Sequence, residues 1–141
     1  MKRTLSLVLR SALILTPLSF AAAPLMAAVE SVKAPEVSLD EVKALVGSKG
    51  ATFLDANSSK MFSEAHIPGA VSFAENKEAL AKVLPTDKNA LIVAYCGGPR
   101  CTAWESAAAE VQKLGYTNIK HFKGGIKVWQ DSGAKVEKKN G

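Results

Sequence analysis

The sequence predicts one α/β domain of three layers, in which a mostly parallel sheet is flanked by helices. Short apolar runs alternate with stretches of helical periodicity between residues 38 and 132, a pattern typical of strands connected by helices. The apolar run 90–95 holds no charged residue, as expected of a central strand covered on both faces. The chain has 141 residues without an internal repeat or a Gly/Ser-rich linker, which is the size of a single domain.

The first half of this domain is predicted to contain three helical segments and two strands. Ser38 and the acidic residues after it are typical of a capped helix start, and this helix is expected to end near Gly47. The Pro68-Gly69 pair indicates a turn before a strand, and Pro85 ends a helix. The elements after the first helix are therefore a strand at 51–55, a helical turn at 59–65, a strand at 70–73 and a helix at 75–84.

The second half of the domain is predicted to repeat the order strand, loop, helix. The strand 90–95 leads through a glycine-containing loop into an amphipathic helix that reaches Leu114, with Gly115 as its left-handed terminator. Phe122 and Trp129 are expected in the core. The remaining elements are a strand at 118–122, a turn at Gly124-Gly125 and a short helix at 126–130.

The first 28 residues are predicted to be a secretory signal peptide, which leaves residues 29–141 as the mature domain. Residues 1–10 hold three basic side chains, residues 11–23 form an apolar stretch, and the small residues Ala27 and Ala28 suit cleavage. An uncleaved anchor is disfavoured because prolines and polar residues interrupt the apolar stretch, and a membrane span needs ~20 predominantly apolar residues. We therefore expect a bacterial periplasmic or secreted protein with no stable membrane anchor after cleavage.

The formal charge of +5 does not indicate a nucleic acid partner. Three of the 18 basic residues lie within the first ten positions, which leaves 15 basic against 13 acidic side chains in the rest of the chain. These charges form no Lys/Arg cluster, so they argue for no particular partner. We expect no nucleic acid partner.

Cys96 is the candidate nucleophile because it directly follows the predicted central strand, 90–95. In open α/β sheets, ligands bind at the carboxyl ends of strands. Gly97 and Gly98 have no side chains, so backbone N–H groups can converge on an anion bound at the sulfur. The N-terminus of the next helix, which carries a partial positive charge, points at the same place. That helix end and the nearby Arg100 favour the thiolate, which is the reactive form of cysteine. The loop therefore predicts an anion cradle around a nucleophile.

Other interpretations of Cys96 stay open. It could be an inert buried side chain. It could form a structural disulfide with Cys101, although the loop between them is short and a helix start could hold the two apart. A zinc site is disfavoured because the two cysteines and two histidines of the chain lack the close-paired spacings of zinc ligands, and we expect no metal.

The spacings argue against three classes of cysteine protein. Three residues separate Cys96 from Arg100, whereas a cysteine phosphatase loop has five between its nucleophile and its arginine. Four residues separate Cys96 from Cys101, whereas a thioredoxin-type pair is Cys-x-x-Cys. Neither His66 nor His121 has a spacing that supports a papain-like Cys–His pair.

Four features in the same order resemble the rhodanese family. They are Asp55, the run His66-Ile67-Pro68-Gly69-Ala70, the loop that begins at Cys96, and Gly124-Gly125-Ile126 with Trp129. The resemblance covers roughly residues 37–132. It implies a five-stranded parallel sheet flanked by helices and a loop cysteine that takes sulfane sulfur from a donor such as thiosulfate and carries it as a persulfide.

The resemblance implies a sulfurtransferase in which Cys96 is the catalytic residue. The substrate-binding residues would be Gly97, Gly98, Arg100, Cys101 and Thr102. No metal or organic cofactor is expected, because sulfur itself is the group carried and thiol exchange supplies the mechanism. The partners implied are a small anionic sulfur donor and a thiol or other sulfur acceptor. Apart from the resemblance, the pair Cys96 and Cys101 in an oxidising compartment allows a periplasmic redox partner.

Five positions near the site differ from the family pattern. Cys101 stands where family loops commonly have arginine, and Arg100 stands one place earlier, so the donor preference stays open. Asn57 and Met61 replace an arginine and a glutamate, which removes both halves of an ion pair. Ala65 stands where the family usually has glycine.

Cys101 allows two interpretations. As a resolving thiol it could attack a Cys96 persulfide, release sulfide and leave a disulfide, and an exported protein meets an oxidising compartment. It could instead be a small residue in the first turn of the helix. The alternatives to a sulfurtransferase are therefore a non-catalytic sulfur- or anion-binding accessory module and a thiol–disulfide redox protein that uses Cys96 and Cys101.

Asp55 and His66 are predicted to have structural roles. His66 belongs to a Pro-Gly turn motif and is expected to be hydrogen-bonded rather than to carry protons. Asp55 is expected to tie a loop to the end of a strand. Trp104 follows the cysteine loop and could line a pocket or pack against the loop.

Overall fold

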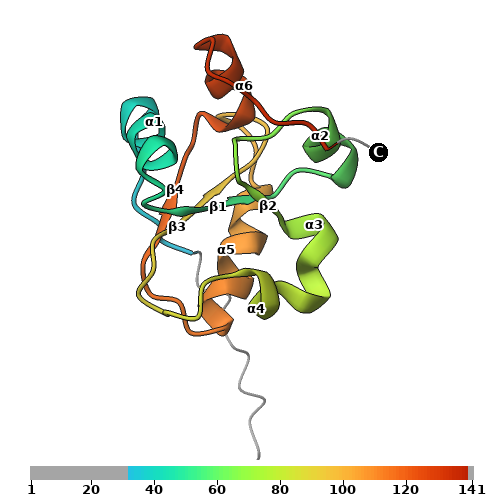
Figure 1. The fold of residues 1–141 in the computed structure, drawn as a ribbon. Coiled ribbons are helices and arrows are strands. Elements are labelled where there is room, and N and C mark those ends of the chain that lie inside the picture. The colour runs from blue at the N-terminus through green and yellow to red at the C-terminus, as the bar shows by residue number, and fades with distance from the viewer. Residues whose placement is uncertain (1–31, 140–141) are drawn as a thin grey trace, which may run out of the picture.

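Four parallel strands form the central sheet of this protein, in the order β2-β1-β3-β4. The computed structural model describes residues 32–139, in which helices cover both faces of the sheet (Figure 1). The predicted α/β class with a parallel sheet flanked by helices is confirmed. In chain order the elements are α1 (Leu39–Ser48), β1 (Thr52–Asp55), α2 (Ser59–Glu64), β2 (Val71–Ser72), α3 (Phe73–Asn76), the 3-10 helix η1 (Lys77–Ala79), α4 (Leu80–Val83), β3 (Ile92–Tyr95), α5 (Ala103–Lys113), β4 (Ile119–His121) and α6 (Gly125–Asp131).

The expected number of five strands is wrong for the described residues, whose sheet has four. The segment before α1 lies beside β4, where the Val37 N–H donates to the His121 carbonyl and the His121 N–H donates to the Pro35 carbonyl, both at 2.9 Å. This pairing amounts to one bridge between Glu36 and His121. It cannot lengthen, because Pro35 has no N–H and Ser38 already caps α1.

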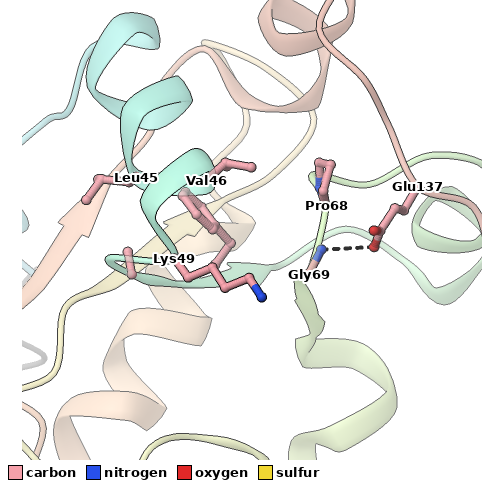
Figure 2. Close-up of a pocket in the computed structure, with 8 residues that line it drawn as sticks. Leu45, Val46, Lys49, Pro68, Gly69 and Glu137 are labelled. Carbon is pink, nitrogen blue, oxygen red and sulfur yellow. Dashed lines mark hydrogen bonds between the residues drawn. The ribbon is translucent and has the colours of Figure 1, made fainter.

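The first helix begins where the sequence predicts and ends slightly later. The Ser38 hydroxyl accepts from the Glu41 N–H at 3.3 Å, and the Glu41 carboxylate accepts from the Ser38 N–H at 2.8 Å, which is a capping box. The helix continues past Gly47 to Ser48 and stops because Lys49 adopts the left-handed conformation, with φ 54°. Lys49 lies at the edge of the cavity drawn in Figure 2.

The single helix predicted at 75–84 is instead a series of short turns formed by α3, η1 and α4. The series begins early, at Phe73, because the Ser72 hydroxyl caps α3 by accepting from the Glu75 N–H at 3.3 Å. It breaks at Asn76, whose side-chain amide donates to the Ser72 carbonyl at 2.8 Å and so competes with regular helical bonding. The early start also limits β2 to two residues.

The central strand and the helix after it are confirmed. All four residues of β3 are buried, and this strand pairs with β1 on one side and β4 on the other. α5 ends before Gly115, which has the left-handed φ of 93°. Phe122 and Trp129 are buried, as predicted.

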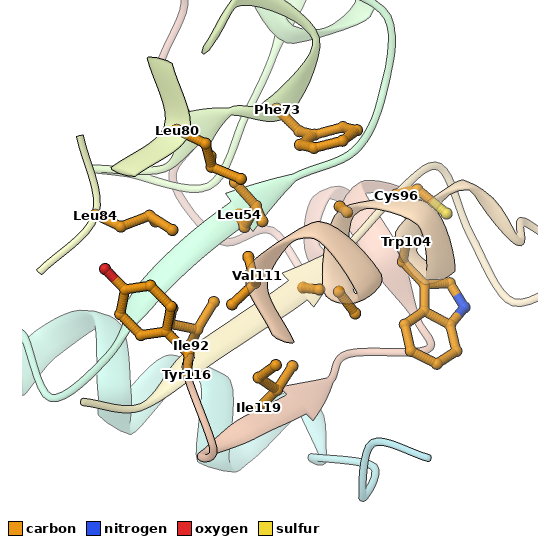
Figure 3. Packing of buried hydrophobic residues seen from close by; sticks show 13 residues of the cluster. Leu54, Phe73, Leu80, Leu84, Ile92, Cys96, Trp104, Val111, Tyr116 and Ile119 are labelled. Carbon is orange, nitrogen blue, oxygen red and sulfur yellow. The ribbon is translucent and has the colours of Figure 1, made fainter. Parts of the chain in front are cut away.

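Alternation along the strands builds two apolar cores, one on each face of the sheet. In β3, Ile92 and Ala94 belong to the core on the α5 face (Figure 3), whereas Val93 belongs to the core covered by α1 and α6. Cys96 continues this alternation and belongs to the core on the α5 face. The pattern of the strand therefore decides on which face the cysteine lies.

The predicted signal peptide at 1–28, with its cleavage site, lies outside the described residues. Within residues 32–139, no helix has both the length and the apolar character needed to cross a bilayer.

Candidate active site

Cys96 lies at the carboxyl end of β3, immediately after Tyr95. Loops at this end of a parallel sheet are where ligands bind. The side chain of Cys96 is only 1% exposed and packs into the core on the α5 face (Figure 3). Its carbonyl accepts from the Ile126 N–H at 2.9 Å. The core thus holds the side chain of Cys96, and α6 holds its backbone.

Gly125, the first residue of α6, allows this helix to approach the cysteine loop closely. Its φ is +62°, and a Cβ added there would overlap the Cys96 carbonyl oxygen and lie 2.7 Å from the Gly98 nitrogen. Glycine alone permits both the backbone conformation and the contact. The approach also lets the Lys127 N–H donate to the Gly97 carbonyl at 3.1 Å. The sequence indicated a turn at Gly125 and a feature of the family resemblance, but not this contact, because a contact with a distant loop leaves no local pattern.

Cys96 and Cys101 are joined by a disulfide, and no cysteine is free among the described residues. Their Cα atoms are 6.2 Å apart because the loop folds back in a turn, in which the Cys101 N–H donates to the Gly98 carbonyl at 3.0 Å. The suggestion that a helix start could hold the cysteines apart is wrong, since α5 begins only at Ala103 and leaves Cys101 in the turn. The structure is the oxidised form of the predicted nucleophile.

The rest of the loop offers donors and a positive charge to a ligand. The N–H groups of Gly98, Arg100 and Thr102 donate to no acceptor within residues 32–139. Arg100 and Thr102 are exposed, and Arg100 pairs with no carboxylate among the described residues. Thr102 precedes α5, but its hydroxyl does not cap the helix. All the predicted substrate-binding residues lie in this loop, namely Gly97, Gly98, Arg100, Cys101 and Thr102.

Asn57 and Met61 lie beside the loop. A Cβ added at Gly97 would lie 3.5 Å from Asn57 Oδ1 and 3.7 Å from Met61 Cε. Asn57 is 6% exposed, and its Nδ2 has no partner among residues 32–139, whereas Met61 is 43% exposed. A neutral amide and a thioether therefore stand on this side of the loop, and neither contributes a charge to it.

Asp55 is a fully buried carboxylate at the end of β1. One oxygen accepts from the Asn57 N–H at 2.7 Å, and Oδ2 has no partner among the described residues. Burial raises the pKa of Asp55 above its usual value, and the neighbouring Tyr95 hydroxyl and the Asn57 N–H oppose this rise. Tyr95 in turn accepts from the Ile67 N–H at 3.1 Å. Asp55 thus connects the end of β1 to the loop that contains Asn57.

His66 is buried between α2 and the C-terminal segment. Its ring stacks on Phe62 with centroids 3.9 Å apart, and its Nδ1 lies 2.7 Å from the Phe62 carbonyl oxygen. Its Nε2 lies 3.7 Å from Glu137 Oε2, which also accepts from the Gly69 N–H at 2.9 Å. The backbones of His66 and Glu137 exchange two hydrogen bonds of 2.9 Å. Sequence analysis missed Glu137, because no local signal indicates so distant a contact.

Trp104 packs in the core on the α5 face. It is 9% exposed and stacks on His121, with ring centroids 3.7 Å apart and planes inclined by 12°. Burial is the main cause of the lowered pKa of His121, the negative charge of Glu36 opposes this shift, and the charge of Lys123 adds to it. No group of three or more potential metal-ligating side chains occurs within the part of the chain that the structure describes.

A cavity of about 360 Å³ lies beside α1 (Figure 2). None of the predicted site residues lines it, so it is separate from the cysteine loop. Its lining residues are Leu45, Val46, Lys49, Ala51, Phe53, Pro68, Gly69 and Glu137.

The fold and the loop together define an α/β protein with a cysteine loop at the carboxyl end of its central strand. The model of the rhodanese-like domain matches residues 38–132. The chain therefore belongs to the rhodanese-like domain family.

Solved structures share the fold of this chain. The BH2092 protein from Bacillus halodurans is 30% identical, with a TM-score of 0.65 over 75% of this chain and 78% of that one. A thiosulfate sulfurtransferase from Pseudomonas aeruginosa is 24% identical, with a TM-score of 0.58 over 76% of this chain and 21% of that one. A human single-domain sulfurtransferase is 23% identical, with a TM-score of 0.57 over 70% and 97%. The comparison with curated proteins gave no match.

Replacing Gly125 with alanine is expected to lower the free energy of unfolding by roughly 2–5 kcal/mol. About 1–2 kcal/mol comes from the left-handed backbone, and about 1–3 kcal/mol from the overlap with the Cys96–Gly98 backbone. Denaturant unfolding of the purified variant measures the loss.

Gly133→Ala is the matched control for this prediction. Gly133 also has a left-handed φ, 73°, but an added Cβ would meet nothing within 4 Å. It should therefore show the backbone cost alone, about 1–2 kcal/mol. Equal losses in the two variants would contradict the inference that α6 packs on the loop through Gly125.

Replacing Asp55 with asparagine tests the buried carboxylate. Because the pKa of Asp55 is raised in the folded state, protonation favours folding, and this contribution is lost as pH rises through the folded-state pKa. Wild type should therefore gain stability relative to Asp55→Asn as the pH is lowered from about 7 to about 4, in urea titrations at each pH. Asp87→Asn is the control, because exposed Asp87 makes the same bond to the N–H two residues on. A difference between wild type and Asp55→Asn that does not vary with pH would contradict the assignment.

Proposed function

We propose that this protein is an exported bacterial sulfurtransferase that moves sulfane sulfur from an anionic donor such as thiosulfate, through a persulfide on Cys96, to a thiophilic acceptor. The observation that carries the proposal is the position of Cys96 at the end of β3, in a loop where the N–H groups of Gly98, Arg100 and Thr102 have no acceptor among the described residues. Membership of the rhodanese-like domain family supports the same activity. The export and the periplasmic location rest on the predicted signal peptide alone.

The first half-reaction follows from the chemistry of the loop. The Cys96 thiolate attacks the outer sulfur of thiosulfate, the sulfur–sulfur bond of the donor breaks, and sulfite leaves with the bonding electron pair. The N–H groups of Gly98, Arg100 and Thr102 stabilise the negative charge that moves through the site. The second half-reaction passes the outer sulfur to an acceptor thiol or another thiophile and restores the Cys96 thiolate.

Reduction of the disulfide must precede this reaction. Cys96 is bonded to Cys101 in the structure, and a disulfide sulfur is no nucleophile. The protein therefore needs a thiol reductant in its compartment, and a periplasmic redox partner would meet this need. Reduction produces a Cys96 thiolate, which can attack the sulfur donor.

The first test is the mass of the protein after exposure to thiosulfate. Reduced, desalted Cys101→Ser protein should gain one sulfur atom, located on Cys96 by peptide mapping, because its Cys96 cannot re-form the disulfide. The double variant Cys96→Ser/Cys101→Ser is the control and should gain none. If Cys101→Ser protein with a titratable Cys96 thiol shows no adduct with thiosulfate or other sulfane donors, the proposed function is wrong.

A second prediction concerns Arg100. The variant Arg100→Gln should load sulfur from thiosulfate roughly 3- to 10-fold more slowly at low salt, because it loses the one positive side chain of the loop, and the difference should shrink at high salt. The rate of sulfite release measures loading. Lys113→Gln is the control, since it removes the same charge from the last turn of α5. An equal slowing in both variants would mean that net charge, not a contact with Arg100, controls the rate.

A further inference from the structure

The cysteine loop already contains a second thiol that reaches Cys96. The Cα atoms of Cys96 and Cys101 are 6.2 Å apart, within the range that a disulfide spans without movement of the backbone. The turn closed by the Cys101 N–H and the Gly98 carbonyl holds this distance. Cys101 also packs against the core that contains Cys96. The two sulfur atoms therefore meet within the native fold.

We propose that Cys101 resolves the Cys96 persulfide and releases the sulfur as sulfide, so that the protein reduces sulfane sulfur at the expense of a dithiol. This inference rests on the proposed function, since it begins from the persulfide. The Cys101 thiolate attacks Sγ of Cys96, the bond between that Sγ and the outer sulfur breaks, and the outer sulfur leaves as hydrosulfide. The Cys96–Cys101 disulfide forms in the same step, and the proton of the Cys101 thiol leaves with the sulfide. The two electrons that reduce the sulfur come from the cysteine pair.

Burial of Cys96 favours this internal route over attack by a free thiol. In the disulfide form of the structure Cys96 is 1% exposed, and we expect the same burial to restrict the approach of an external thiol to its Sγ in the persulfide. The Cys101 thiol does not have to enter from solvent, because the loop holds it next to Sγ of Cys96. Well-positioned groups in one molecule react at very high effective concentrations. The product of the step is the disulfide observed in the structure.

The two cysteines differ in how an external thiol can reach them. Cys101 is half-buried, whereas Cys96 is almost completely buried. An incoming dithiol should therefore attack Sγ of Cys101, and Cys96 should depart as the thiolate. The N–H groups of Gly98, Arg100 and Thr102, which have no acceptor within residues 32–139, are available to stabilise this leaving thiolate, and a more stable thiolate leaves faster.

The complete cycle balances with two co-substrates. Thiosulfate and a dithiol are consumed, and sulfite, hydrogen sulfide and the disulfide of the dithiol are formed. Thiosulfate supplies the sulfur and the dithiol supplies the two electrons. The physiological dithiol is thus a reductant of the same chemical class as dithiothreitol, which serves as the probe.

The decisive experiment follows one turnover without added thiol. Fully reduced wild-type protein and Cys101→Ser protein are each mixed with one equivalent of thiosulfate, and sulfite, sulfide and intact mass are measured over time. Wild type should release one sulfite and one sulfide per chain and end as the disulfide. Cys101→Ser should release sulfite only, keep the added sulfur on Cys96, and release sulfide when dithiothreitol is added. Cys101→Ala should behave as Cys101→Ser does, which excludes an effect of the serine hydroxyl.

The outcomes separate this inference from the proposed function. A stable persulfide on wild type without sulfide, or equal sulfide release from wild type and Cys101→Ser, overturns the role of Cys101 and leaves the sulfurtransferase intact. If neither protein releases sulfite from thiosulfate and neither gains sulfur from other sulfane donors, the proposed function itself is overturned.

A second measurement tests the direction of reductant attack. Oxidised wild type is treated briefly with a monothiol such as glutathione, quenched with an alkylating agent in acid, and mapped by peptide mass. The mixed disulfide should lie on Cys101 and the alkylated thiol on Cys96. The reverse distribution would overturn the assignment of Cys101 as the sulfur that the reductant attacks.

Discussion

The arrangement of this site depends on the contact between the backbone of α6 and the cysteine loop. The first N–H groups of a helix lack partners within the helix, and buried carbonyl groups need donors. At Gly125, α6 and the loop come close enough for both needs to be met, because the N–H groups of Ile126 and Lys127 donate to the carbonyls of Cys96 and Gly97. Because the carbonyls of Cys96 and Gly97 point to α6, their oxygens do not face a ligand bound in the loop. The N–H groups of the loop therefore remain available for an anion.

The same contact explains why the two cysteines are not equivalent. Cys96 is fixed twice, by the core on the α5 face and by its bond to α6. Cys101 is held by the turn that starts at Gly98 and packs only at the edge of the same core, so it lies closer to solvent. Because of this difference, the buried sulfur of Cys96 carries the substrate sulfur, and the more accessible sulfur of Cys101 exchanges with reductants. The chemistry of the pair is therefore divided by burial, with both thiols on one short loop.

Features encoded by neighbouring residues could be predicted from the sequence, and features that join distant segments could not. The charge-free run before Cys96 predicted the buried β3, and the Ser38 cap predicted the start of α1. The contact of Gly125 with the loop and the bonds of Glu137 to His66 join segments that are far apart in the chain. These contacts form only when the helices pack on the sheet, and the local periodicity of the sequence does not predict that packing. The absence of a fifth strand has a local cause, because Pro35 has no N–H. The register in which the segment around Glu36 lies on β4 is again a tertiary property.

The differences from the family pattern form a coherent set when they are considered together in the folded loop. An arginine at position 101 would add a charge-assisted contact to a bound anion, and this chain has a thiol there instead. Asn57 and Met61 beside Gly97 bring no charge either, so Arg100 is the only cation that the described part of the loop offers. A site with fewer anion contacts holds a sulfur donor less tightly, whereas a second thiol bonded to Cys96 provides a way to remove the sulfur once it has been transferred. With cysteine instead of arginine at position 101, the loop is therefore better suited to exchange electrons than to retain an anion. The disulfide in the structure is the product of that exchange.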